Sequence, residues 1–170
     1  AGDQPLELAM PAWTPGSYLI RDFSAHVEQL RARTPDGREL EARKVAKNRW
    51  RIEPADAAEL VVEYDVWAGE LNVATSWVEA DMAVLNGAAL FLFSAASRDQ
   101  PQQLTVVLPE AWAGVHTPLR AMDEPGVYLA DDYDEQTLAS WLGAGMARVA
   151  QLVPGLAERL GMPTIPEAVS

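Results

Sequence analysis

The sequence contains no cysteine, which excludes disulfide bonds, thiolate zinc sites and cysteine nucleophiles. Only two histidines are present, His26 and His116, and neither belongs to an HExxH motif. A zinc site needs about three protein ligands, so we favour surface or hydrogen-bonded histidines over a site built from these two and a carboxylate. The nucleophile motif Gly-x-Ser-x-Gly and the phosphate-binding glycine loops are missing as well. We therefore expect no catalytic constellation, metal site or cofactor in this chain.

Positive charge is also scarce. The 170 residues carry 13 Lys and Arg against 25 Asp and Glu, for a net charge of −12. Nucleic-acid binders and proteins that dock on anionic membranes use basic surfaces, so this balance argues against both. The longest apolar stretch, around residues 87–93, is far shorter than the roughly 20 residues of a membrane span, and the first ten residues do not resemble a signal peptide. We expect a soluble protein without a membrane span, cytoplasmic or periplasmic, and the sequence leaves the compartment open.

The negative charge is unevenly distributed along the chain. Residues 52–135 hold sixteen acidic and two basic side chains, whereas residues 1–51 hold seven acidic and nine basic ones. Two differently charged surfaces of one domain are the favoured interpretation, and an acidic rim that attracts a cationic ligand is the alternative. The acids at positions 131, 132, 134 and 135 lack the spacing of a calcium loop, so we expect a solvated acidic loop there.

Short stretches of strand-forming residues, separated by turn residues, dominate the first 135 positions. We expect strands near residues 6–8, 26–33, 38–46, 48–53, 59–68, 71–77, 88–94 and 104–108. Turns are predicted at Thr34-Pro35-Asp36-Gly37 and at Asn86-Gly87. The stripe of Phe23, Val27 and Leu30 also fits a helix, which leaves a helical alternative for the second strand. The chain is long enough to bury a core, and the pattern predicts a mainly β, antiparallel β-sandwich-like domain over residues 1–135.

Residues 136–170 change character. Their apolar side chains follow helical spacing from Leu138 to Leu160, and Pro154 divides the pattern. We expect one or two C-terminal amphipathic α-helices, either as a helical appendage or as the start of a next domain. Such a helix would cover the β domain, a second copy of the chain or a further domain.

Six tryptophans are present in the chain. Trp50, Trp67 and Trp77 fall in predicted strands, and we expect them to fill the core. Trp13 lies in a loop rich in proline and glycine, where burial is not assured. The alternative is that tryptophans stack against a carbohydrate or peptide ligand.

The segment MPAWTPGSYLIRDFSAHV, residues 10–27, resembles the N-terminal region of the glycyl aminopeptidase family, zinc metallopeptidases that usually carry a C-terminal PDZ domain. In that family a strand ends in a Pro-Ala-Trp-x-Pro-Gly-Ser-Tyr loop, which an Ile-Arg-Asp-Phe element follows. The matching residues are Pro11, Ala12, Trp13, Pro15, Gly16, Ser17, Tyr18, Ile20, Arg21, Asp22 and Phe23. Weaker similarities extend the resemblance to about residues 5–135, and they include Lys47 with Trp50, Asn86-Gly87, Pro109 with Trp112, and the acidic segment around Tyr133.

The resemblance also has departures. One or more strands precede the Pro-Ala-Trp loop in the family, whereas about ten residues precede it here. A Leu-Val-Asp-Ser-Pro stretch that follows the Tyr-Asp-Glu segment in the family is missing here. The family's zinc ligands have no counterpart in this chain, so none is carried over.

The resemblance implies a noncatalytic N-terminal domain or fragment of a bacterial zinc aminopeptidase, with zinc expected in the parent enzyme. It implies that the catalytic domain of the same parent is the partner. The chemistry of the loop, with two prolines that fix the backbone around Trp13, indicates that it helps to place the amino terminus of a peptide. The residues of this substrate or interdomain loop are Trp13, Pro15, Gly16, Tyr18, Arg21 and Asp22. The competing interpretation of the loop is a structural brace in which Arg21 and Asp22 pair with each other.

Two other functions remain open at this point. The chain could be a free-standing β-sandwich module that binds peptide or carbohydrate through exposed tryptophan. It could also be an interaction scaffold that dimerises through the helix of residues 136–161.

Overall fold

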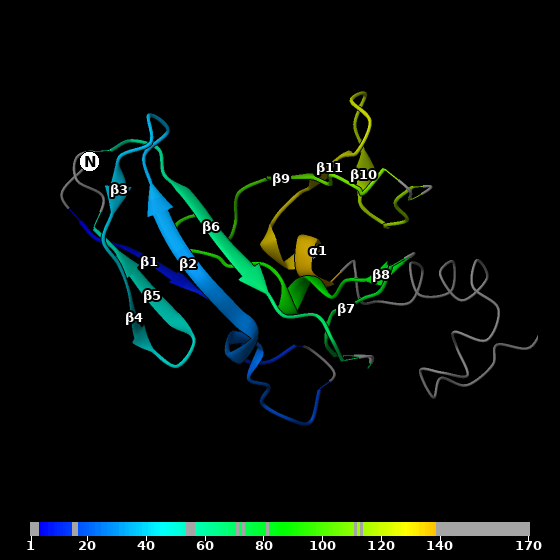
Figure 1. The fold of residues 1–170 in the computed structure, drawn as a ribbon, viewed down its shortest axis with the longest axis horizontal. Helices are drawn as coiled ribbons and strands as arrows, with labels where there is room; N and C mark the ends of the chain where they lie inside the picture. The colour runs from blue at the N-terminus through cyan, green and yellow to red at the C-terminus, as the bar shows by residue number, and fades with distance from the viewer. Residues whose placement is uncertain are drawn as a thin grey trace, which may run out of the picture.

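The fold is mainly β, as the sequence predicts. The computed structural model describes residues 4–14, 17–53, 57–70, 72, 74–80, 82–110, 112 and 114–138. These residues form four small antiparallel sheets, two short 3-10 helices and one short α-helix (Figure 1). The C-terminal amphipathic helices expected beyond residue 138 lie outside the described residues. No helix within the described ranges is long and apolar enough to cross a membrane.

The first sheet has the strand order β1-β5-β4 and contains β1 (Leu6–Ala9), β5 (Arg49–Ile52) and β4 (Ala42–Ala46). Alternation along β5 buries Trp50 and Ile52 and leaves the arginines between them exposed. Leu8 and Leu6 of β1 stand opposite these two buried residues. One face of this sheet is therefore apolar, and it points towards the core.

The second sheet has the order β3-β2-β6 and contains β3 (Glu39–Leu40), β2 (Val27–Arg33) and β6 (Val61–Val66). The predicted turn between β2 and β3 is confirmed, because Gly37 has φ +92° and its N–H donates to the carbonyl of Thr34 at 2.9 Å. The segment after residue 26 is a strand and not the helical alternative. A 3-10 helix, η1 (Phe23–His26), precedes it.

The remaining elements lie on the other side of β6 in Figure 1. One sheet pairs β7 (Trp77–Val78) with β8 (Ala83–Val84). Another has the order β10-β11-β9 and contains β10 (Arg120–Ala121), β11 (Val127–Ala130) and β9 (Gln102–Thr105). The 3-10 helix η2 (Gly87–Ala89) and the helix α1 (Tyr133–Leu138) are the remaining elements of the described residues.

The hairpin turn predicted at Asn86-Gly87 is wrong. The Asn86 side chain accepts a hydrogen bond from the N–H of Ala88 at 3.0 Å and thereby caps η2. The strand expected over residues 88–94 is replaced by η2 and an isolated bridge between Phe93 and Ala9. The asparagine side chain, which can cap a helix as well as favour a turn, accounts for the difference.

The core cluster lies between the β1-β5-β4 sheet, the β3-β2-β6 sheet and η2. Its buried members are Met10, Phe23, Trp50, Ala74, Ala88 and Ala89, with Val27, Leu30 and Leu92 packed against them. Trp50 and Trp77 are buried as predicted, but the prediction for Trp67 is wrong, since this residue is 52% exposed. Alternation explains the error, because Trp67 follows Glu63 and Asp65 at two-residue spacing and so shares their solvent-facing side.

The acidic segment of residues 131–135 forms the start of α1 and is not an open loop. Asp132 Oδ1 accepts a hydrogen bond from the N–H of Glu135 at 2.7 Å, and Glu135 Oε2 accepts one from the N–H of Asp131 at 2.5 Å. This reciprocal arrangement is close to a capping box. Asp134 is tied to Arg98 by an ion pair of 2.9 Å. Helix capping and an ion pair therefore account for this cluster of carboxylates.

Candidate functional site

The loop that joins β1 to η1 carries the candidate site, and it lies at the lower end of the molecule in Figure 1. It starts from Met10, which is fully buried. The N–H of Met10 donates to the carbonyl of Asn48 at 3.0 Å, and Asn48 Nδ2 donates to the carbonyl of Met10 at 2.7 Å. The turn between β4 and β5 thus anchors the start of the loop to the first sheet.

Hydrogen bonds also close the loop on itself. The N–H of Arg21 donates to the carbonyl of Ala12 at 2.7 Å, which brings the two ends of the loop together. Trp13 Nε1 donates to the carbonyl of Ser17 at 2.8 Å, and the N–H of Ser17 donates to the carbonyl of Thr14 at 3.1 Å. Hydrogen bonds within the loop therefore brace its backbone.

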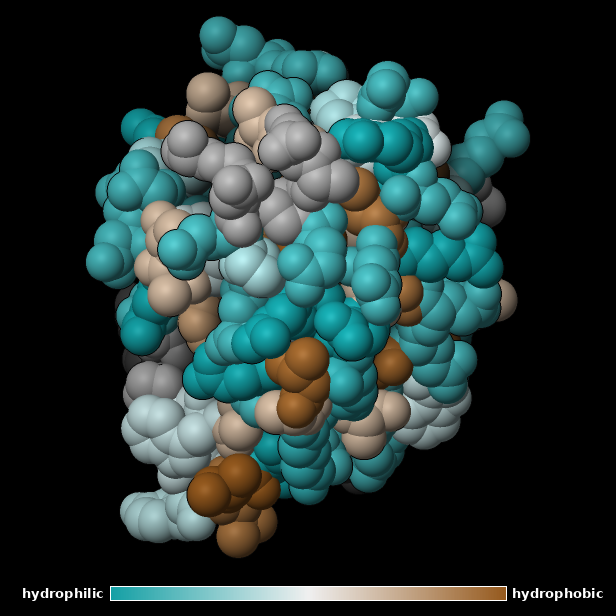
Figure 2. Space-filling model, turned by 90° about the vertical axis from the view of Figure 1, so that its left-hand side faces the viewer, coloured by the Kyte–Doolittle hydropathy of each residue, from teal (hydrophilic) through white to brown (hydrophobic). Residues whose placement is uncertain are grey.

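The side chains that this braced loop presents are largely apolar and exposed. Trp13 is 52% exposed, Leu19 61%, Ile20 83% and Tyr18 102%. Figure 2 shows a hydrophobic group at the lower edge of an otherwise largely hydrophilic face, at the level of this loop in Figure 1. Contiguous exposed apolar side chains mark surfaces that meet another protein segment or a ligand.

Two charged residues end the loop, and they have different environments. Asp22 forms an ion pair of 2.9 Å with Lys47, and the Ser24 hydroxyl lies 3.0 Å from its Oδ1. The hydrogen bond from Lys47 lowers the pKa of the Asp22 carboxyl, and Ser24 lowers it further. Arg21 Nε is buried and has no hydrogen-bond partner among the described residues. Asp22 thus pairs with Lys47, not with Arg21 as the bracing interpretation assumed.

An aromatic pair lies at the C-terminal end of η1. The rings of His26 and Trp67 lie 5.3 Å apart in an edge-on arrangement, and the N–H of Trp67 donates to the carbonyl of His26 at 2.9 Å. Trp67 also covers Gly69, where a Cβ atom would lie 2.6 Å from the indole ring. His26 directly precedes β2 and ends η1, so this pair lies next to the end of the loop.

The structure brings four of the six predicted site residues together in one loop: Trp13, Tyr18, Arg21 and Asp22. Pro15 and Gly16 lie outside the described residues. The sequence argument missed the exposed Leu19 and the bracing role of Ser17. The apolar run Tyr18-Leu19-Ile20, which directly follows the prolines and glycine of the loop, is the signal that would have identified Leu19.

Within the described ranges, no group of three or more His, Cys, Asp or Glu side chains is arranged to hold a metal ion. His26 lies against Trp67, and His116 is exposed in the segment before β10. The two histidines therefore occupy separate parts of the fold.

The fold and the loop define a class of protein: a β-rich domain that presents one hydrogen-bonded, largely apolar loop at its end. The family model of the Peptidase M61 N-terminal domain matches residues 1–137, and the chain belongs to this family. Comparison with curated protein sequences gave no match.

A crystal structure of an aminopeptidase N family protein from Idiomarina loihiensis is similar to this chain. Its sequence is 30% identical, the TM-score is 0.70, and the similarity covers 81% of this chain. The same similarity covers 24% of the Idiomarina chain, so this chain spans about a quarter of that protein.

Proposed function

We propose that this chain is the noncatalytic N-terminal domain of a glycyl-aminopeptidase-like zinc metallopeptidase. Membership of the N-terminal domain family and similarity to one quarter of an aminopeptidase-family protein support this proposal. The zinc and the residues that cleave the peptide then belong to another part of the parent protein. In this proposal the loop of residues 10–22 packs against the catalytic domain and borders the bound peptide.

The observation that carries the role of the loop is its combination of a braced backbone with exposed apolar side chains. Leaving Tyr18, Leu19 and Ile20 in water costs hydrophobic free energy that a partner surface would recover. Because hydrogen bonds already hold the backbone, little further conformational entropy is lost on docking. A loop of this kind suits a fixed interdomain contact.

Arg21 adds a polar element to the same surface. A buried donor without a partner costs about 1–3 kcal/mol, and Arg21 Nε is such a donor among the described residues. A carboxylate or a carbonyl of the catalytic domain would satisfy this nitrogen. The loop would then dock through an apolar contact and one directional hydrogen bond.

Hydrolysis of a glycine or alanine anilide tests the noncatalytic role. The 170-residue chain should show no hydrolysis with zinc supplied, and the parent protein should hydrolyse the substrate. Activity of the 170-residue chain that survives replacement of both histidines would contradict the proposal.

The double variant Tyr18→Ser, Ile20→Ser in the parent protein tests the loop. We expect kcat/KM to fall about tenfold, the equivalent of about 1.4 kcal/mol, because the variant loses apolar contact with the catalytic domain. The control is Val107→Ser, which removes an apolar side chain that is 88% exposed outside the loop. Equal activity of the loop variant and the control would show that the loop does not contribute.

Exposed tryptophan supports a second candidate, a module that binds peptide or carbohydrate by itself. Trp13 and Trp67 are each 52% exposed, and the indole ring of Trp67 lies next to Gly69. This candidate predicts a saturable change in tryptophan fluorescence of the 170-residue chain with a peptide or an oligosaccharide. Loss of that change in Trp13→Ala would favour it, and an unchanged spectrum at millimolar ligand would remove it.

A further inference from the structure

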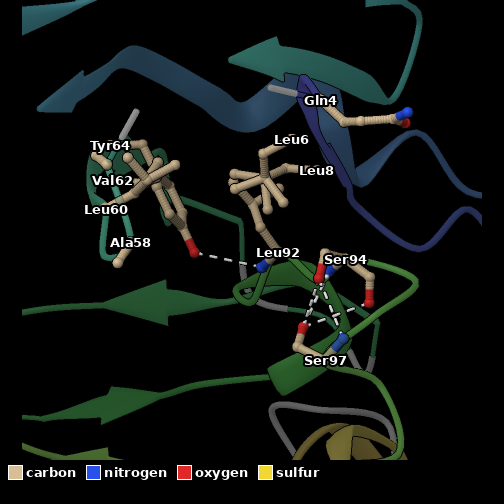
Figure 3. A pocket seen from close by; sticks show the side chains of 11 residues that line it. Gln4, Leu6, Leu8, Ala58, Leu60, Val62, Tyr64, Leu92, Ser94 and Ser97 are labelled. Atoms are coloured by element: carbon tan, nitrogen blue, oxygen red, sulfur yellow. Dashed lines mark hydrogen bonds between the residues drawn. The ribbon is translucent and has the colours of Figure 1, made fainter. Parts of the chain in front are cut away.

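A groove of about 540 Å³ opens between the β1-β5-β4 sheet and the β3-β2-β6 sheet (Figure 3). One wall consists of Leu6 and Leu8 of β1, and the other of Leu60, Val62 and Tyr64 in and before β6. Leu92, Ser94 and Ser97 lie along its base in the close-up. The groove is therefore an open side of the core, where the apolar faces of the two sheets do not meet.

Strands with an open edge flank the groove on both sides. β1 ends the order β1-β5-β4, and β6 ends the order β3-β2-β6. Among the described residues, no strand pairs with the outer edge of β6, and the outer edge of β1 makes only the bridge between Ala9 and Phe93. Such edges are templates for a further strand.

The bridge to Phe93 shows which backbone groups of β1 face outwards. The N–H of Ala9 donates to the carbonyl of Phe93 at 2.8 Å, and the N–H of Phe93 donates to the carbonyl of Ala9 at 2.9 Å. Backbone groups of an antiparallel strand alternate in direction, so the N–H and C=O of Glu7 point to the same outer side. The bridge does not extend to Glu7, and no backbone group in the described part of the chain pairs with this position of the edge.

The chemistry of the lining defines the partner. In a chain with a net charge of −12, every residue that lines the groove is uncharged, and most are aliphatic. A charged segment would lose its hydration there without an opposite charge to replace it. The groove fits an extended strand that directs uncharged, apolar side chains inwards at every second position.

We propose that this groove receives a β-strand from the parent polypeptide, from a part outside these 170 residues. The inference rests on the proposed function, since it requires a longer peptidase. The Idiomarina relative, of which this chain covers 24%, shows that a protein with this domain has additional chain that can supply the strand. The strand would pair with the edge of β1 at Glu7 and fill the space between Leu8 and Val62.

Amide hydrogen exchange tests the proposal by comparison of the parent protein with the 170-residue chain. The N–H of Glu7 should exchange rapidly in the 170-residue chain and about a hundredfold more slowly in the parent. The N–H of Leu8, which alternation directs towards β5, should be protected in both and serves as the internal control. Val62→Lys in the parent should abolish the added protection of Glu7, whereas Val45→Lys on the exposed strand β4 should preserve it.

Other outcomes overturn the proposal. Rapid exchange of the Glu7 amide in a full-length parent would show that no strand pairs there, and the proposed function would still stand. A native protein of only 18.5 kDa would contradict both the strand proposal and the proposed function. Glu7 protection that appears in the 170-residue chain with rising concentration, together with dimers in light scattering, would identify a second copy as the occupant.

Discussion

Trp50 and Trp67 are both strand-associated tryptophans in the sequence, yet the structure gives them opposite environments. Trp50 is 5% exposed and belongs to the core cluster, and the ammonium group of Lys44 lies 4.9 Å from the centre of its ring. Trp67 is 52% exposed and rests on Gly69 and His26. Residue type alone predicted burial for both. The two-residue alternation separates them, because it places Trp50 on the buried side of β5 and Trp67, just after β6, on the solvent-facing side.

Alanine substitution should therefore affect these two residues differently. We expect Trp50→Ala to reduce the free energy of unfolding by about 3–5 kcal/mol, because it leaves a large cavity in the core. Trp67→Ala should cost about 1 kcal/mol or less, as for most surface substitutions. Urea unfolding followed by circular dichroism measures both, and a larger loss for Trp67→Ala would reverse the assignment of the core.

The Asp22–Lys47 pair makes a second prediction at this scale, on the dependence of stability on pH. The folded-state pKa of Asp22 is lowered from 3.8, so its stabilising contribution is complete above that value and is lost as the pH falls through the lower folded pKa. Asp22→Asn should therefore be less stable than the original chain at pH 7, by a small amount because the pair is exposed. The difference should vanish once the pH lies below the lowered folded pKa of Asp22, and a difference that stays constant as the pH falls would contradict the assignment.

At the scale of elements, local sequence patterns correctly predicted a turn whose conformation depends on the backbone. They gave wrong predictions where a side-chain cap or a contact with a distant residue determines the structure. Thr34 to Gly37 form the predicted turn, because glycine provides the positive φ that this turn requires. Asn86 caps a 3-10 helix, and Phe93 is held by Ala9, a residue more than eighty positions earlier. No local pattern contains that second partner, so the strand predicted over residues 88–94 could not be corrected from the sequence.

Two glycines with positive φ allow the cost of backbone strain to be separated from the cost of a clash. Gly37→Ala should reduce stability by about 1–2 kcal/mol through strain alone, since a Cβ atom there meets nothing within 4 Å. Gly126→Ala should cost more, because its Cβ atom would also lie 2.8 Å from the carbonyl oxygen of Val106. Thermal unfolding of both variants measures the difference, and equal losses would mean that the β9–β11 connection moves to relieve the clash.

At the scale of the whole molecule, the sequence predicted the mainly β fold class, whereas the function of the loop as a site stays a prediction. The Pro-Ala-Trp loop was identified from residues 10–23, and the structure shows four of its predicted residues in one braced and exposed loop. The ion pair of Asp22 with Lys47 and the open groove beside Leu8 were not predicted. Both depend on how distant strands pack, and such packing leaves no short-range signal in one sequence.

The central claim is that this chain is one domain of a longer peptidase. The most direct measurement is the mass of the native protein in its source cells, by immunoblot with an antibody raised against this domain. A band several times heavier than 18.5 kDa is the predicted result, in line with the share of the Idiomarina protein that this chain covers. A single band near 18.5 kDa would contradict the claim and would leave the binding module as the better account of the exposed tryptophans.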